Sequence, residues 1–320
     1  MAIGRGEVFH ELFPAVPVPF GRSGQIDEAA LARYAAWMAE QTIGGVAVWA
    51  HTGRGLYLTD QERETVLRAW RRAMPAGRLV IAAAGAALGE PGVAEALNSA
   101  RAMAWQAADL GADALLVHPP VAFRDRPDCE TVLLDYHATI AEAGLPLVLF
   151  YLYEAAGGIS YSLKILAELL ARPEVIGIKI ATLDRVMTCQ DIARQVKEQA
   201  PSKLVITGED RFLGYSLMCG AEAALIGMAA ACTGLQAELL RSYWTGQADR
   251  FLALSAAVDD LAQNTFLAPM EGYIQRMLWC LVHHGIIPAE AACDPWGPEL
   301  EAAEFDRIRA CLGRVGKEDG

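Results

Sequence analysis

The stretch Val175-Ile176-Gly177-Ile178-Lys179-Ile180-Ala181 is typical of a strand buried on both faces, apart from its lysine. An ammonium group loses its hydration in such a strand, so lysine is normally excluded from it. The chain has five lysines among its 27 basic residues, which makes a chance placement less common. Burial lowers the pKa of a lysine and frees its amine to attack a carbonyl carbon. The alternative is a lysine at the strand end whose amine extends to water.

The neighbours of Lys179 within this strand favour the nucleophile. Side chains alternate between the two faces of a strand, so Lys179 shares one face with Gly177 and Ala181. The three isoleucines of the stretch share the other face. Small residues therefore flank the lysine, and they leave space for a substrate beside its amine.

Outward from this strand, apolar strand patterns alternate with helical periodicity along most of the chain. Strands are predicted at 15–20, 45–50, 79–84, 114–118, 147–153, 175–181, 204–207 and 223–228. Helices are predicted at 27–41, 60–74, 91–110, 129–143, 162–171, 184–199, 212–219 and 235–245. Eight strands, each followed by a helix, predict an α/β fold of the (β/α)8 TIM-barrel type. A doubly wound sheet is the alternative, but no GxGxxG motif follows the first strand.

The barrel is predicted to span residues 1–245. Residues 246–320 carry helical periodicity at 248–263, 272–284 and 298–312 and no strand pattern, so we expect a C-terminal helical extension. Active sites of such barrels lie at the C-terminal ends of the strands, which limits the candidate residues to the strand ends and the loops after them.

Composition excludes several classes of function. A net charge of −12 argues against nucleic acid or an anionic membrane as a partner. The seven cysteines form no CxxC pair, and the adjacent His283 and His284 point in different directions on a helix, so no metal site is predicted. Scattered cysteines and the lack of a secretion signal predict a soluble, cytoplasmic protein with reduced thiols.

The loop after the second predicted strand carries Ala50-His51-Thr52-Gly53-Arg54. Its imidazole, hydroxyl and backbone amides are groups that bind a carboxylate. A lone histidine, however, more often caps the backbone. For Arg54 we favour a structural ion pair with Glu62 or Glu64 over binding of a substrate carboxylate.

Other candidates lie at the ends of neighbouring strands. Tyr151 is either a satisfied core residue or a group that moves protons during imine formation. Glu209 and Asp210 either bind polar groups of the substrate or cap the helix that follows them. Gly208 follows the seventh predicted strand, Gly227 lies near the end of the eighth, and both are expected in the substrate site.

Several motifs, in this order, carry a resemblance to one family. They are Pro17-Val18-Pro19-Phe20, Gly24-Gln25-Ile26-Asp27, the loop from Ala50 to Arg54 with Leu58-Thr59 and Glu62-Arg63 behind it, Gly111-Ala112-Asp113-Ala114 and residues 175–182. Over nearly its whole length the chain resembles the dihydrodipicolinate synthase / N-acetylneuraminate lyase family of Schiff-base enzymes. The resemblance implies a barrel that needs no cofactor or metal and assembles as a homo-oligomer, either a tetramer or a dimer.

The resemblance also implies roles for individual residues. Lys179 becomes the lysine that forms the imine. A separation of 28 residues from that lysine selects Tyr151 as the family tyrosine, with Tyr153 as the fallback, whereas counting from Pro146 would select Phe150. Thr52 and the amide of Gly53 would hold the substrate carboxylate, His51 would join the proton relay, and Asp210 would bind the variable part of the substrate.

Departures from the family pattern bear on the substrate. His51 replaces a hydroxyl residue, Arg54 replaces an acid, and Ala156 lies where the synthase has a substrate-binding arginine. The exchanged tyrosine of the synthase, which falls near Pro120 and Val121, is missing. We therefore expect an aldolase or dehydratase that acts on pyruvate or a related 2-oxo acid. The alternatives are a dihydrodipicolinate synthase with a rebuilt site and a catalytically weakened protein that binds oxo acids.

Overall fold

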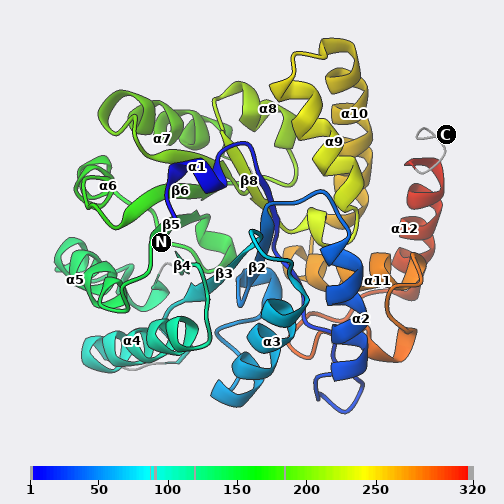
Figure 1. Ribbon diagram of the computed structural model, residues 1–320, viewed down its shortest axis with the longest axis horizontal. Helices are drawn as coiled ribbons and strands as arrows, with labels where there is room; N and C mark the ends of the chain where they lie inside the picture. The colour runs from blue at the N-terminus through cyan, green and yellow to red at the C-terminus, as the bar shows by residue number, and fades with distance from the viewer. Residues whose placement is uncertain (1–2, 87, 90–91, 119, 184, 316–320) are drawn as a thin grey trace.

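Parallel strands form the centre of the protein in a computed structural model that describes residues 3–86, 88–89, 92–118, 120–183 and 185–315. Within these residues the sheet has eight strands in the order β1-β8-β7-β6-β5-β4-β3-β2. The strands are β1 Leu12–Pro14, β2 Gly45–Val48, β3 Leu79–Ala84, β4 Ala114–Val117, β5 Leu147–Leu152, β6 Val175–Ala181, β7 Leu204–Thr207 and β8 Ala223–Ile226. A parallel bridge between Ala15 and Ala47 joins β1 to β2, so the sheet closes into the predicted barrel (Figure 1).

Helices surround this ring of strands (Figure 1). They are α2 Glu28–Ala39, α3 Asp60–Ala73, α4 Val93–Asp109, α5 Cys129–Ala141, α6 Leu163–Leu170, α7 Val186–Gln199, α8 Leu213–Met218 and α9 Thr233–Trp244. Each lies within a few residues of its predicted range. The predicted starts of two helices, Pro91 and Asp184, lie outside the described residues.

The first strand is the clearest error of the prediction, because it lies at Leu12–Pro14 and not at 15–20. Pro17 and Pro19 have no amide hydrogen to donate to a neighbouring strand, so the ladder cannot continue through them. The apolar residues there are still buried, for example Val18 and Phe20, which explains why the pattern resembled a strand.

The short helix α1 Arg5–Val8 covers the N-terminal ends of the strands. Arg5 binds the carboxylate of Glu222 and the carbonyl oxygen of Lys203, residues that directly precede β8 and β7. In Figure 1 this helix lies in front of the strands, near the middle of the ring. Access to the barrel interior is therefore left to the opposite end, where the strands finish.

The C-terminal part forms the helices α10 Ala248–Thr265, α11 Tyr273–His283 and α12 Ala302–Val315, with the 3-10 turns Met270–Gly272 and Ala289–Ala291. These helices lie together on one side of the barrel (Figure 1). Their apolar side chains belong to the same buried cluster as those of the barrel. The backbone of Cys293 also pairs with that of Phe20 in an isolated antiparallel β-bridge. No helix of the described residues is both long enough and apolar enough to span a membrane.

A buried ion pair connects α11 to α12. Arg276 is fully buried, and its Nε donates to Oε2 of Glu304 at 2.8 Å. Its Nη1 donates to the carbonyl oxygen of Leu267 at 2.7 Å, in the segment that leads into α11. The guanidinium thus holds both the last helix and the segment before Tyr273.

We predict that Glu304→Ala lowers the free energy of unfolding by about 3 kcal/mol, because it leaves the buried guanidinium of Arg276 without a counter-charge. Asp306→Ala on the same helix removes only the exposed pair with Arg309 and is expected to cost about 0–1 kcal/mol. Urea denaturation of both variants measures the difference. Equal effects would show that the Arg276–Glu304 pair does not stabilise the extension.

Candidate active site

Lys179 lies inside the barrel at a point where its amine faces a pocket. Its side chain is 6% exposed, and the pocket lining includes Ala181 and Gly208. The Nζ atom lies 4.1 Å from the centroid of the Phe150 ring and makes no hydrogen bond or ion pair within the described part of the chain. Burial lowers the pKa of Lys179 to about 8, although the charges of Asp210 and Glu209 oppose this shift. The amine is therefore partly neutral near physiological pH.

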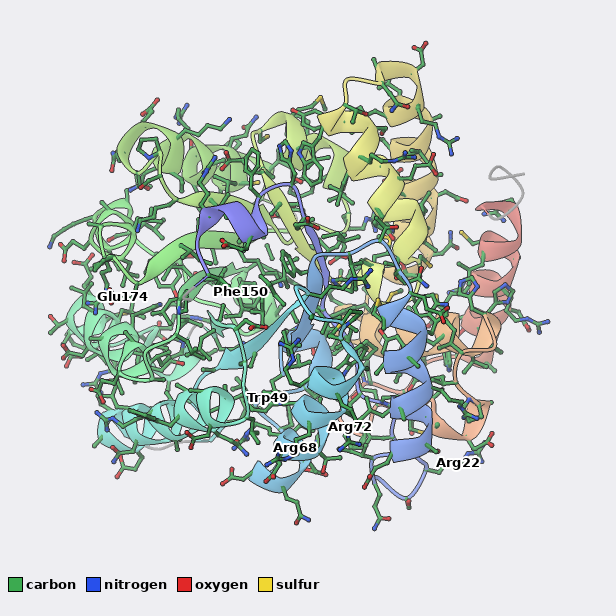
Figure 2. All side chains as sticks on the ribbon, in the orientation of Figure 1. Arg22, Trp49, Arg68, Arg72, Phe150 and Glu174 are labelled. Carbon is green, nitrogen blue, oxygen red and sulfur yellow. The ribbon has the colours of Figure 1, made fainter. Side chains whose placement is uncertain are left out.

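Phe150, and not Tyr151, stands beside Lys179. In the register of β5 and β6, Phe150 is level with Lys179 and Tyr151 with Ile180. Residues at the same level of adjacent parallel strands point to the same face, so Tyr151 points toward the helices. Its ring centroid lies 5.9 Å from that of Tyr161. Phe150 is one of the residues labelled in Figure 2, where it lies within the ring of strands.

The predicted placement of Tyr151 next to the lysine is therefore wrong, and the reason is a register shift. Leu147 pairs with Val175, whereas Val148 pairs with Gly177, so β6 contains one extra residue at this point. Phe150, the residue beside Lys179, therefore lies 29 positions before it in the sequence, and not 28. The fallback residue, Tyr153, does line the pocket, at the end of β5.

The loop after β2 is held in an unusual backbone conformation. Trp49 and Arg54, on either side of His51–Gly53, have φ values of 58° and 52°, which side chains of this size rarely adopt. The indole of Trp49 is buried and donates to the carbonyl oxygen of Arg63 at 3.0 Å. A Cβ at Gly55 would lie 1.9 Å from the carbonyl oxygen of Trp49, so only glycine fits there. The contacts of Trp49 and Gly55 thus hold the loop in this conformation.

This loop delivers His51 and Thr52 to the pocket of Lys179. The amide of Gly53 donates to the carbonyl oxygen of Ala50 at 2.9 Å, so it is not available for the substrate carboxylate as predicted. The amides of His51 and Thr52 donate to no oxygen atom of the described residues.

Tyr273, the first residue of α11, is a pocket residue that the sequence did not reveal. Its hydroxyl lies 2.9 Å from Oγ1 of Thr52 and 3.1 Å from Nδ1 of His51. Its ring stacks on Phe266 with a centroid distance of 4.7 Å. Burial raises the pKa of Tyr273 well above its ordinary value, so its hydroxyl stays protonated. The only available signal was its place at the start of a predicted helix of the extension.

Arg54 forms an ion-pair network with the extension. Its Nη2 donates to Oδ2 of Asp294 at 2.7 Å, and its Nη1 donates to Oε2 of Glu271 at 2.6 Å. The other oxygen of Glu271 lies 3.1 Å from Nε2 of His51. Burial alone would raise the pKa of Glu271, but the contacts with His51 and Arg54 lower it to about 2. Arg54 therefore makes structural ion pairs, as expected.

The partners predicted for Arg54 were wrong. Glu62 accepts a hydrogen bond from the amide of Thr59 in the capping box of α3, and Glu64 binds Arg68. Both carboxylates point along their own helix, whereas Arg54 turns toward the C-terminal extension.

The two acids after β7 hold backbone in place and do not cap α8, which begins without a side-chain cap. Glu209 is 1% exposed and accepts from the amide and hydroxyl of Thr182, at 2.6 and 2.8 Å. Asp210 accepts from the amide of Met228 at 2.7 Å and lines the pocket of Lys179. Burial raises the pKa of Asp210, and the charge of Lys179 opposes this.

Gly208 and Gly227, both predicted for the site, lie so close to Lys179, Tyr273 and Thr52 that a side chain would crowd them. A Cβ at Gly208 would lie 2.6 Å from Cε of Lys179. A Cβ at Gly227 would lie 3.1 Å from Cε2 of Tyr273 and 3.3 Å from Oγ1 of Thr52. Within the described residues no group of three or more histidine, cysteine or acidic side chains could hold a metal ion.

The site as a whole thus combines a buried amine with a set of hydroxyl, imidazole and carboxylate groups. Lys179 and Asp210 come from β6 and the loop after β7, His51 and Thr52 from the loop after β2, and Tyr273 from the extension. An amine of lowered pKa beside protonated hydroxyls is suited to attack a carbonyl carbon and to move the protons that this requires.

Comparisons with known proteins show what this chain is similar to. The model of the Dihydrodipicolinate synthetase family matches residues 8–304. A probable mitochondrial 4-hydroxy-2-oxoglutarate aldolase of Emericella nidulans is 27% identical over 263 residues, which cover 78% of this chain and 81% of that protein. A 4-hydroxy-tetrahydrodipicolinate synthase of Xanthomonas axonopodis pv. citri is 29% identical over 303 residues, which cover 91% of this chain and 93% of that protein.

Among solved structures, YagE shares the fold. It is a prophage protein of E. coli K12 that belongs to the dihydrodipicolinic acid synthase family and was solved in complex with pyruvate. The match has a TM-score of 0.81 at 19% identity and covers 96% of this chain and 98% of YagE.

We predict that the ammonium of Lys179 titrates near pH 8, whereas an ordinary lysine titrates at a pH of about 10.4. Asp210→Asn removes a negative charge that stabilises the ammonium, so it should lower the pKa of Lys179 further. Reductive methylation with 13C-formaldehyde followed by NMR titration measures both values, with Lys179→Arg to assign the resonance. A Lys179 resonance that titrates where an ordinary lysine does would contradict the prediction.

Proposed function

Because the chain belongs to the dihydrodipicolinate synthetase family, we propose that it is a lyase that forms an imine between Lys179 and pyruvate or a related 2-oxo acid. Members of this family are class I lyases and aldolases that act on such acids. The observation that carries the proposal for this chain is the buried amine of Lys179, which has no ion-pair partner within the described residues and faces a pocket.

The proposed reaction begins with attack of the neutral Nζ of Lys179 on the C2 carbonyl carbon of the acid. The resulting carbinolamine takes up a proton at its hydroxyl, which leaves as water while the C=N bond forms. The protonated imine then withdraws electrons from C3, so that a C3–C4 bond can break or a C3 proton can leave to give an enamine. Asp210, close to the lysine, stabilises the positive charge of the imine.

Tyr273 is the proposed proton-transfer group, in place of Tyr151, which the family spacing selects but which points away from Lys179. Glu271 is ionised, so Nε2–H of His51 donates to its carboxylate, and Nδ1 accepts from the hydroxyl of Tyr273. The hydroxyl of Thr52 in turn donates to the oxygen of Tyr273. This chain of hydrogen bonds links a base, His51, to the edge of the pocket in which the carbinolamine forms.

The substrate carboxylate is proposed to bind at the loop after β2. The backbone amides of His51 and Thr52 are the donors there. With the carboxylate on this loop, the 2-oxo carbon is directed toward Lys179 on the facing side of the pocket.

The first test is trapping of the imine. Incubation with pyruvate and borohydride should add one reduced pyruvate to the protein, and peptide mass spectrometry should locate it on Lys179. Lys179→Met should abolish the adduct, while Lys164→Met, which changes an exposed lysine, should retain it. An adduct on another lysine, or none with pyruvate and longer 2-oxo acids, would overturn the proposed function.

The second test concerns the proton relay. Exchange of the methyl protons of pyruvate with D2O, followed by NMR, reports enamine formation without any second substrate. Tyr273→Phe should slow this exchange by about 10²-fold and alter its pH profile, because it removes the proton carrier but keeps the ring packing.

Tyr151→Phe is the matched control, since its hydroxyl lies on the helix side of β5 and its loss should leave the exchange rate within about twofold of wild type. If both variants exchange at the wild-type rate, Tyr273 has no part in proton transfer. If Tyr151→Phe alone is slow, the relay runs through the tyrosine that the family spacing selects.

A further inference from the structure

A second, outer pocket adjoins the pocket of Lys179. The two share His51 and Leu152 in their walls. The outer pocket has a volume of about 260 Å³ and is formed by the loops after β2, β3, β4 and β5 together with the extension. Because it lies beside the inner pocket and shares two wall residues with it, it is the place where the part of a substrate beyond the 2-oxo acid would lie.

Large apolar side chains gather at this outer pocket while remaining open to solvent. Leu88 is 50% exposed, Tyr57 44%, Val121 40% and Trp296 36%, and all four line the pocket. Single exposed apolar residues are normal on a protein surface, but a cluster around a concave site indicates ligand binding. Ala156, where the resemblance would place a substrate-binding arginine, adds an apolar wall without charge.

The charged and imidazole side chains of the outer pocket already bind one another or the backbone. Arg54 is bound to Asp294 and Glu271, and Glu271 uses its second oxygen for His51. His118 contacts the carbonyl oxygen of Trp49 through Nε2 at 3.2 Å and is buried. A substrate carboxylate could pair with Arg54 only by displacing Asp294 or Glu271, which already neutralise the guanidinium.

The aromatic side chains of the pocket form a fixed wall. The rings of Tyr57 and Trp296 lie 5.3 Å apart with an angle of 35° between them. Trp296 also packs edge to face on the buried Phe20 at 5.3 Å, and the guanidinium carbon of Arg54 lies 5.5 Å from the ring of Tyr57. A wall held in this way binds a flat ring with little loss of side-chain freedom.

We propose that the outer pocket binds an aryl aldehyde, as the partner that the Lys179 enamine of pyruvate adds to or releases. This inference rests on the proposed function and names the class of its second substrate. In the direction of synthesis, C3 of the enamine forms a bond to the aldehyde carbon, and the aldehyde oxygen takes up a proton. Water then adds to C2 of the imine and releases Lys179, which gives a 4-aryl-4-hydroxy-2-oxobutanoate; cleavage is the same sequence in reverse.

The test compares aldehydes at saturating pyruvate. Benzaldehyde, glyceraldehyde and glyoxylate represent an aryl aldehyde, a sugar-like aldehyde and an aldehyde acid. We expect kcat/KM for benzaldehyde to exceed the other two values by at least about 100-fold, since their polar groups meet an apolar wall. Trapping of pyruvate on Lys179 is measured in the same preparations, because it needs no aldehyde.

Two variants test the pocket itself. Trp296→Ala, which removes a partly exposed ring, should lower kcat/KM for benzaldehyde by about 10- to 100-fold. Val121→Asp, at an exposed position, should do so by placing a charge in the apolar wall. Both should trap pyruvate as wild type does. Trp105→Ala is the matched control, since Trp105 is similarly exposed on α4, away from the pocket, and should leave all rates unchanged.

Several results would overturn the inference. One is a preference for glyceraldehyde or glyoxylate in protein that traps pyruvate; another is unchanged benzaldehyde kinetics in both pocket variants. A third is that Val121→Asp dissociates an oligomer in sedimentation without changing aldehyde preference, which would show that a second copy of the chain covers the apolar cluster. Failure to trap pyruvate at all would instead contradict the proposed function.

Discussion

Removal of the Lys179 ammonium from water is the interaction on which the rest of the site depends. The closed barrel buries the side chain, the adjacent Gly208 leaves space for its Cε, and the face of Phe150 lies over its amine. Burial favours the neutral amine, and Asp210 moderates the effect by stabilising the charged form. A fully paired lysine would be a poor nucleophile, and a fully exposed one would stay protonated at neutral pH.

The C-terminal extension is part of this site and more than a cover for the barrel. It supplies Tyr273 to the inner pocket and Glu271 and Asp294 to Arg54. The two departures from the family pattern in the loop after β2, His51 and Arg54, are thereby connected: both bind Glu271. One carboxylate orients the imidazole and neutralises the guanidinium, so the two substitutions form a single electrostatic unit that links the loop to the extension.

The barrel and its lysine could be predicted because their signals are local. Apolar strands alternate with capped helices, and Lys179 interrupts an apolar run within seven residues. Tyr151 was misplaced because one extra residue in β6 shifts the register, and no composition signal marks it. The partners of Arg54 lie 217 and 240 residues away, and Tyr273 lies 221 residues from Thr52. Contacts at such separations arise only when the extension packs over the mouth of the barrel.

The central claim is that Lys179 and a relay built around Tyr273 act on one bound 2-oxo acid. A crystal structure of the borohydride-reduced pyruvate adduct tests it most directly. We expect continuous density from Nζ of Lys179 to C2 of pyruvate, the carboxylate on the loop of His51 and Thr52, and the hydroxyl of Tyr273 as the nearest phenol to C2. An adduct that turns its carboxylate away from Thr52, or that places Tyr151 or Tyr153 closer to C2 than Tyr273, would contradict it.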